Sequence, residues 1–292
     1  MIKFAKQKIA VTADCKFGLG NRLYTIIGAL YIAKKLNLQT IAVNWKPDNE
    51  CACQFDDLFE PLPDINFNDT IKSDVLNIFI NFYFNNTLIK KNQISYLVTD
   101  NLIVRIKNII YKHSSQKHTL NLVYTSTILP QECDIKFINN FFNSLKVKNN
   151  ISKKVNQFIT KKNIGKDIAG LHFRRTDKTK FESNIVSSHY NKALTHIHNN
   201  PQKYFFVASD DYCFLKILSI YKNVIHFPTK YYPFYDKITK EIKRDKESVI
   251  NSLITMIVLS RTTIFNTDIV DHSAFLGCAY YLSFVDTGTL LQ

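Results

Sequence analysis

The run "GLHFRRTDKTKFE", from Gly170 to Glu182, places a His, two adjacent Arg, an Asp and a Glu directly behind a short apolar segment. If residues 168–174 form a parallel strand, His172 and Arg174 share one of its faces because side chains alternate along a strand. Open α/β sheets bind their ligands at the carboxyl ends of strands. Arg174 and Arg175 at such an end suit a diphosphate, since a guanidinium is permanently charged and pairs two oxygens at once. An exposed charged loop after a strand is the alternative.

A second strand-like run, "VASDD", ends in two carboxylates, Asp210 and Asp211. They can form an acidic pair that binds a metal, or Asp210 can accept hydrogen bonds from a ribose or a base. A third interpretation is a helix cap, because Ser209, Asp210 and Asp211 all suit the start of the helix predicted to follow. No further acidic ligand stands nearby in the sequence, which argues against the metal.

Two glycines precede the first predicted helix in "GLGNR", residues 18–22. The turn lacks the third glycine of a dinucleotide fingerprint and the Gly-Lys-Ser/Thr of a P-loop, so it is weak evidence for either. Gly18 and Gly20 still permit a close backbone approach to a ligand, and a helix N-terminus favours anions. Ser273 stands at the start of the last predicted helix, as either a phosphate contact or a plain helix cap.

Alternating strands and helices must position these residues. Residues 8–13, 23–37 and 39–45 predict strand, helix and strand, a β-α-β unit that implies a parallel sheet. After residue 166 the pattern predicts strands at 167–173, 203–209, 223–227 and 262–266, with helices at 187–200, 210–222, 246–261 and 272–285. The fold class is therefore α/β. Residues 56–164 predict no clear topology, and the simplest architecture is two α/β domains, 1–160 and 161–292, with a ligand cleft between them.

The composition is that of a globular protein, with 46% hydrophobic and 21% charged residues in 292. No apolar run reaches the roughly 18 residues that span a bilayer. The N-terminal segment predicts a first strand rather than a signal peptide, so we expect a cytoplasmic protein. Six cysteines show no zinc-site spacing, and we expect reduced, structural thiols.

A formal net charge of +14 leaves two function classes open. Clustered Lys and Arg neutralise phosphates in nucleic-acid-binding proteins, which makes a protein that binds nucleic acid or another polyanion one hypothesis. The lysines here are spread over the whole length, which favours a generally basic surface. An anionic small substrate suits the same charge.

These motifs, in this order, resemble the fucosyltransferase superfamily that includes the α1,6-fucosyltransferases, the bacterial nodulation fucosyltransferases and the protein O-fucosyltransferases. "HFRRTDKTKFE" resembles the His-x-Arg-Arg-Thr-Asp-Lys signature of the α1,6 enzymes, with an acidic residue ten positions after the His. The segment from Gly18 to Trp45 is similar to the glycine-Asn turn and helix that open the protein O-fucosyltransferases. "VASDD" and "DHSAFLGCAYY" fall where the family has its acidic strand end and its last, Ser-containing motif.

The resemblance implies a GT-B-like fold of two Rossmann-like domains and an inverting transfer of fucose from GDP-fucose, without a metal, to a sugar hydroxyl. The expected acceptor is a glycan containing N-acetylglucosamine, with the N-terminal domain on the acceptor side. We expect no nucleic-acid partner and no membrane span. By the resemblance, the phosphate clamp and base are Arg174, Arg175 and Glu182, and the donor contacts are Gly18, Gly20, Asn21, Arg22, His172, Asp177, Lys178, Asp210 and Ser273.

One position departs from the α1,6 pattern. Where those enzymes carry an Asp that recognises guanine, this sequence has Thr255. A different nucleotide sugar is therefore an alternative donor. A nucleotide-dependent enzyme of another reaction type, built on the "GLGN" turn, is a further alternative.

Overall fold

The structure is a computed structural model that describes residues 9–39, 41–63, 65–67, 76–81, 93–97, 102–113, 120–174, 191–192, 194–229, 231–236, 241–264, 273–285 and 290–291. The chain forms two compact units. Unit 1 consists of residues 1–46 and 61–141, and unit 2 of residues 47–60 and 142–292. Residues 47–60 and 142–160 of the predicted first domain thus belong to unit 2.

Unit 1 contains a six-stranded sheet in the order β3-β2-β1-β6-β4-β5, in which every pairing is parallel. Its strands are β1 (Ile9–Asp14), β2 (Ile41–Asn44), β3 (Ile65–Phe67), β4 (Leu76–Asn81), β5 (Gln93–Leu97) and β6 (Leu120–Tyr124). Helix α2 (Leu102–His113) also belongs to this unit, and α3 (Ile135–Ser144) begins in it. Four of these strands lie in the region where the sequence predicts no topology.

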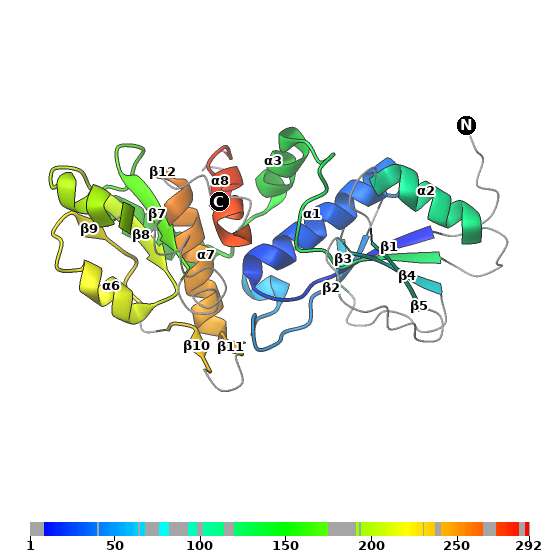
Figure 1. Ribbon diagram of the computed structural model, residues 1–292, viewed down its shortest axis with the longest axis horizontal. Coiled ribbons are helices and arrows are strands. Elements are labelled where there is room, and N and C mark those ends of the chain that lie inside the picture. Colours follow the sequence, from blue (N-terminus) through cyan, green and yellow to red (C-terminus); the bar gives the residue numbers. More distant parts are fainter. Residues whose placement is uncertain are drawn as a thin grey trace. The chain divides into compact units, whose positions relative to one another are not determined.

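Helix α1 (Leu19–Lys35) packs on β1, β2 and β6, as Figure 1 shows. It fits because Gly28 faces the ring of Tyr124, where an added Cβ would lie 2.2 Å from a ring carbon. The buried ring donates its hydroxyl to the carbonyl of Ile128 at 2.7 Å. The helix begins at Leu19, four residues earlier than the sequence predicts, so Gly20, Asn21 and Arg22 are in its first turn.

Unit 2 contains a four-stranded parallel sheet in the order β12-β7-β8-β9. The strands are β7 (Ala169–Phe173), β8 (Phe205–Ser209), β9 (Val224–Ile225) and β12 (Thr263–Ile264), and β10 (Phe234–Tyr235) pairs antiparallel with β11 (Ile242–Lys243). Its helices are α4 (Asn149–Lys162), α6 (Tyr212–Leu218), α7 (Lys246–Ser260) and α8 (Ala274–Leu282), and residues 194–199 are also helical. Within the described residues, the predicted strands and helices of this half are thus confirmed in type.

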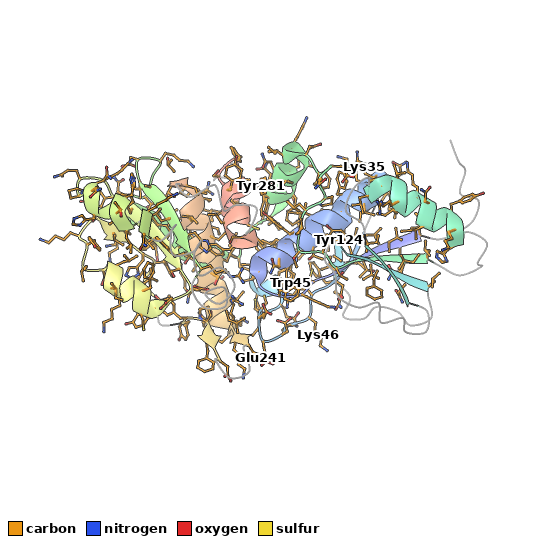
Figure 2. All side chains as sticks on the ribbon, viewed as in Figure 1. Lys35, Trp45, Lys46, Tyr124, Glu241 and Tyr281 are labelled. Carbon is orange, nitrogen blue, oxygen red and sulfur yellow. The ribbon has the colours of Figure 1, made fainter. Side chains whose placement is uncertain are left out.

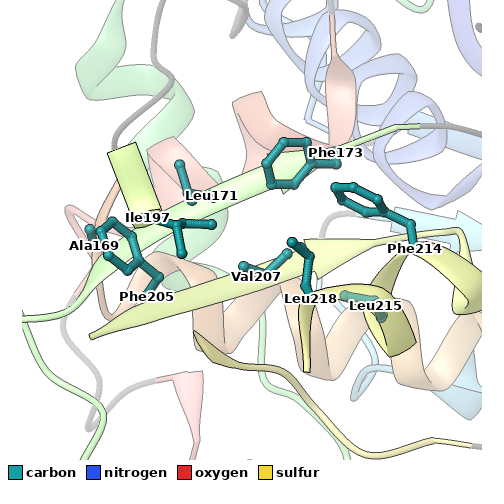
Figure 3. Close-up of a cluster of buried hydrophobic side chains, with 9 residues drawn as sticks. All are labelled: Ala169, Leu171, Phe173, Ile197, Phe205, Val207, Phe214, Leu215 and Leu218. Atoms are coloured by element: carbon teal, nitrogen blue, oxygen red, sulfur yellow. The ribbon is translucent and has the colours of Figure 1, made fainter. Parts of the chain in front are cut away.

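The two faces of β7 serve different purposes. Alternate residues Ala169, Leu171 and Phe173 enter a buried apolar cluster with β8 and α6 (Figure 3). The opposite face carries Gly170 and His172. A Cβ on Gly170 would lie 2.0 Å from the hydroxyl of Thr262, so β7 approaches the end of α7 too closely for any side chain.

Residues 47–60 bond to unit 2 although they interrupt the sequence of unit 1. The backbone N–H of Arg244 donates to the carbonyl of Asn49 at 2.7 Å. The ammonium of Lys246 lies 2.5 Å from the carboxylate of Asp57. Burial raises the pKa of that carboxyl, but the hydrogen bonds from Lys246 and from the backbone of Gln54 outweigh burial and leave the pKa lowered. A further ion pair joins Lys148 to Glu60. These contacts join residues 47–60 to Lys148 and to the segment around Arg244 and Lys246, so residues 47–60 are an integral part of unit 2.

Candidate functional site

The strand order gives each sheet a topological switch point, the place where successive connections leave a strand in opposite directions. In unit 2 the order β12-β7-β8-β9 puts this point at the carboxyl end of β7. In unit 1 the order β3-β2-β1-β6 puts it at the carboxyl end of β1. Ligands of open α/β sheets bind at such points. His172 and Arg174 mark the first point, and the turn before α1 marks the second.

His172 is a buried side chain at the carboxyl end of β7, only 7% exposed. Its ring stacks on Phe275 of α8, with centroids 4.8 Å apart and planes 21° apart. Burial, and secondarily the nearby charge of Arg174, lowers the pKa of His172 from 6.5 to about 3. The imidazole is therefore neutral at any physiological pH, and it can offer hydrogen bonds and a flat face but no charge.

Arg174 directly follows β7 and is half-buried. The His172–Phe275 contact brings the end of β7 to the beginning of α8, the helix capped by Ser273. The hydroxyl of Ser273 accepts from the backbone N–H of Leu276 at 3.3 Å, which is the helix-cap alternative. The same hydroxyl keeps its own O–H as a donor, so capping does not exclude a phosphate contact. The strand end that carries Arg174 and the N-terminus of α8 are thus joined through one side-chain contact, and a cation and a helix N-terminus both favour anions.

The two carboxylates after β8 have different surroundings. Asp211 is the N-cap of α6, and its carboxylate accepts from the backbone N–H of Phe214 at 3.1 Å. The hydroxyl of Ser209 accepts from the N–H of Asp211 at 3.2 Å. Capping therefore belongs to Asp211. Asp210 is half-buried at the end of β8, beside β7, and its donor contact stays a prediction.

At the switch point of unit 1, Gly18 is the N-cap of α1 and has no side chain to cap the helix. Gly20 and Asn21 follow in the first helical turn, which contains no acidic residue. Their approach to a donor stays a prediction.

Arg22 points inward from the same turn and is fully buried. Its Nε donates to the carbonyl of Phe17 at 2.8 Å and its Nη1 to the carbonyl of Lys46 at 2.9 Å. The guanidinium also lies over the ring of Trp45, 5.2 Å from the ring centroid. Trp45 and Lys46 are labelled in Figure 2. These contacts give Arg22 a structural role, and they argue against the predicted direct contact between its side chain and a donor.

The remaining predicted residues, Arg175, Asp177, Lys178 and Glu182, lie outside the described residues. Thr255 is half-buried in α7. Among the residues that the structure describes, no three His, Cys, Asp or Glu side chains are grouped to hold a metal ion. Within the same residues, no helix combines the length and the apolar character needed to cross a bilayer. Cys51 and Cys53 are buried with their sulfurs 3.9 Å apart, well beyond the ~2.05 Å of a disulfide bond.

Three features of the site were not expected from the sequence. Phe275 looks like one more apolar residue of a helix, and only the structure pairs it with His172. Asp14 ends β1 and accepts from the side-chain amide of Asn44 at 2.7 Å. Phe17 adopts a left-handed backbone conformation with φ 65°. A lone carboxylate at a strand end was a usable sequence signal for Asp14, whereas nothing in the sequence indicates the conformation of Phe17.

No family model matches the sequence, and no curated protein matches it. Solved structures do match. One is the NodZ α-1,6-fucosyltransferase soaked with GDP-fucose, with a TM-score of 0.58 and 17% identity over 95% of this chain and 93% of that one. Another is fucosyltransferase NodZ from Bradyrhizobium, with a TM-score of 0.57 and 15% identity over 94% and 92% of the two chains. POFUT1 in complex with GDP-fucose matches with a TM-score of 0.52 and 13% identity over 94% of each chain.

These matches span nearly the whole length of both partners at an identity where sequence comparison alone finds nothing. They confirm the fold-level resemblance that the motifs indicated. The chain has the GT-B-like α/β fold of the fucosyltransferases NodZ and POFUT1.

Proposed function

We propose that this protein is an inverting fucosyltransferase that transfers fucose from GDP-fucose to a hydroxyl of a glycan containing N-acetylglucosamine. The observation that supports it most is the corner of unit 2 where His172 stacks on Phe275. That contact sets Arg174 and the N-terminus of α8 at the switch point of the sheet. Both carry positive charge, and His172 beside them is neutral.

The reaction uses this corner to stabilise a leaving group. The acceptor oxygen attacks the anomeric carbon of fucose, the bond from that carbon to the diphosphate oxygen breaks, and GDP departs with the electron pair. Arg174 and the hydroxyl of Ser273 stabilise the charge that develops on the diphosphate. Each well-placed donor of this kind contributes on the order of 10²–10³ in rate. Because these groups supply the positive charge, we propose that transfer needs no metal.

The acceptor proton goes to a carboxylate, for which we propose Glu182 on the strength of its spacing from His172. A positioned base of this kind typically contributes about 10²–10⁴. Arg175, Asp177 and Lys178 would complete the loop that follows the clamp. Asp210 would contact the ribose or the guanine.

The test is acceptor-stimulated GDP release from GDP-fucose and from GDP-mannose, with and without EDTA, over N-acetylglucosamine oligosaccharides. We expect EDTA-resistant release from GDP-fucose. Arg174→Ala should lower it about 10²–10³-fold, and Arg105→Ala, which removes an exposed arginine of α2, should leave it unchanged. Full activity in Arg174→Ala would refute the assignment.

A second donor is favoured by one observation. Thr255 puts a hydroxyl on α7 where the resemblance expects a carboxylate for guanine. If release occurs only from another nucleotide sugar, the fold assignment stands and donor selection changes. Steeply salt-dependent binding of DNA or RNA without any GDP release would instead favour the polyanion-binding alternative.

A further inference from the structure

Phe17 occupies an unusual position in the turn between β1 and α1. Its φ of 65° is in the left-handed region, where a bulky side chain is a genuine outlier. Such a conformation costs on the order of 1–3 kcal/mol and persists only where the surroundings enforce it. Yet its side chain is 46% exposed, so the strain is not repaid by burying the phenyl ring.

The surroundings that enforce the conformation are the buried contacts of Arg22. Its Nε holds the carbonyl of Phe17 and its Nη1 holds that of Lys46, which fixes the turn to the end of the neighbouring strand. Cys15 and Leu19, two residues to either side, are buried. The fold thus anchors the turn on both sides and presents the phenyl ring between them.

The electrostatics of the turn indicate what it binds. Lys16 lies 3.1 Å from the carboxylate of Asp14, and Asp14 also accepts from Asn44. The guanidinium of Arg22 is committed to carbonyl oxygens inside the unit. Although the sequence places two cations around this turn, one is paired and the other is buried. A neutral partner therefore fits it better than an anion.

We infer that Phe17 is the platform on which the acceptor sugar stacks, with the exposed ammonium of Lys16, held by the buried carboxylate of Asp14, beside it as a hydrogen-bond donor to hydroxyls. The turn lies at the switch point of unit 1, where an open sheet binds ligands. A flat aromatic ring contacts the C–H face of a pyranose, and an ammonium group donates hydrogen bonds to its hydroxyls. This inference rests on the proposed function, which requires a neutral acceptor, and it assigns that acceptor to unit 1.

The single tryptophan of the chain offers a built-in reporter. Trp45 is buried under the guanidinium of Arg22, which in turn holds Phe17. Titration of the intact protein with tri-N-acetylchitotriose should give a saturable change in its fluorescence. Saturation-transfer NMR of the same sugar is measured in parallel, so that a silent Trp45 does not hide binding.

The informative variant is Phe17→Asn, because Asn tolerates the left-handed region and removes the ring. Its midpoint of thermal unfolding should equal the wild-type value or exceed it by about 1–4 °C. Its affinity for chitotriose should fall about 5–10-fold, the worth of one aromatic contact. Phe17→Tyr should bind within about twofold of wild type. Tyr111→Asn, which removes a 70% exposed ring of α2 in the same unit, should bind like wild type.

Two results would overturn the inference: wild-type affinity in Phe17→Asn, or no chitotriose binding by either method. Calorimetry with GDP separates this outcome from a failure of the proposed function. If GDP binds in an Arg174-dependent way and chitotriose does not bind, the acceptor platform is wrong and the donor assignment stands. If chitotriose binds through Phe17 and GDP does not bind, the sugar site stands and fucosyl transfer fails.

Discussion

The neutral state of His172 makes a quantitative prediction about pH. Its pKa falls from 6.5 to about 3, mainly because the ring is buried. At 1.36 kcal/mol per pKa unit, protonating the folded protein at this site costs about 5 kcal/mol more than protonating the unfolded chain. Because the folded pKa is lowered, the unfolded chain binds the extra proton below pH 6.5. Stability is therefore unaffected above that pH and is lost as pH falls from about 6.5 toward 3.

At pH 5, His172 alone should lower the free energy of unfolding by about 2 kcal/mol, because that pH lies about 1.5 units below the ordinary pKa of 6.5. The direct assay is NMR of the histidine Cε1 protons between pH 8 and 4.5. The chain has eight histidines, and the His172 signal is the one missing in His172→Phe. We expect that signal not to shift over the whole range.

Unfolding experiments test the same number. His172→Phe removes the titrating group and keeps a ring against Phe275, so any packing cost is the same at every pH. The free energy of unfolding of the variant, measured relative to that of wild type, should rise by about 2 kcal/mol between pH 7 and pH 5. Phe275→Leu weakens the stack but keeps the imidazole, and it should retain most of the pH dependence. A His172 signal that titrates near pH 6.5 would refute the burial argument, and with it the conclusion that His172 contributes no charge at the end of β7.

Other changes test the packing and the division of roles. Gly170→Ala should cost more than about 2 kcal/mol because no space exists for a Cβ, whereas Gly165→Ala meets only the end of a flexible side chain and should be nearly neutral in thermal unfolding. Asp211→Ala should cost about 1 kcal/mol of stability without changing GDP affinity, and Asp210→Ala should do the reverse; equal effects would contradict the assignment of the cap. Arg22→Met should lower the free energy of unfolding by about 2–4 kcal/mol, since it removes the buried guanidinium that donates to the carbonyls of Phe17 and Lys46, and a variant as stable as wild type in denaturant titrations would contradict the structural role.

Periodicity predicted the second half of the chain well. Its strands are short and β-branched or aromatic, and its helices carry Ser or Asp at their starts, so local preference and burial agree. The prediction that His172 and Arg174 share one face of a strand rested on the alternation of side chains along a strand. In unit 1 only the first β-α-β segment had such clear signals. Strand β4 carries two Asn and β5 carries Gln and Ser, so neither shows a clear apolar pattern, and β4 pairs with β6, about forty positions later in the sequence.

The candidate site was harder to predict than the fold. A residue type at a strand end indicates a role, but its partners come from packing. Arg22 illustrates the limit, because an Arg after a glycine turn looks like a phosphate ligand until its burial and its carbonyl partners are known. Ser273 and Asp211 illustrate the opposite case, since cap residues have a local geometry that the sequence does encode.

Residues 47–60 belong to unit 2 but lie in the sequence between two segments of unit 1, and this has a consequence for how the protein folds during synthesis. The chain passes between the two units at residues 46/47, 60/61 and 141/142. No single cut can therefore divide it into two self-sufficient fragments. A fragment that starts at residue 142 lacks Asn49, Asp57 and Glu60, and one that ends at residue 141 carries them without their partners. During synthesis, Asp57 can form its ion pair only when Lys246, nearly two hundred positions later, has been made. Completion of unit 2 therefore depends on a segment that leaves the ribosome much earlier.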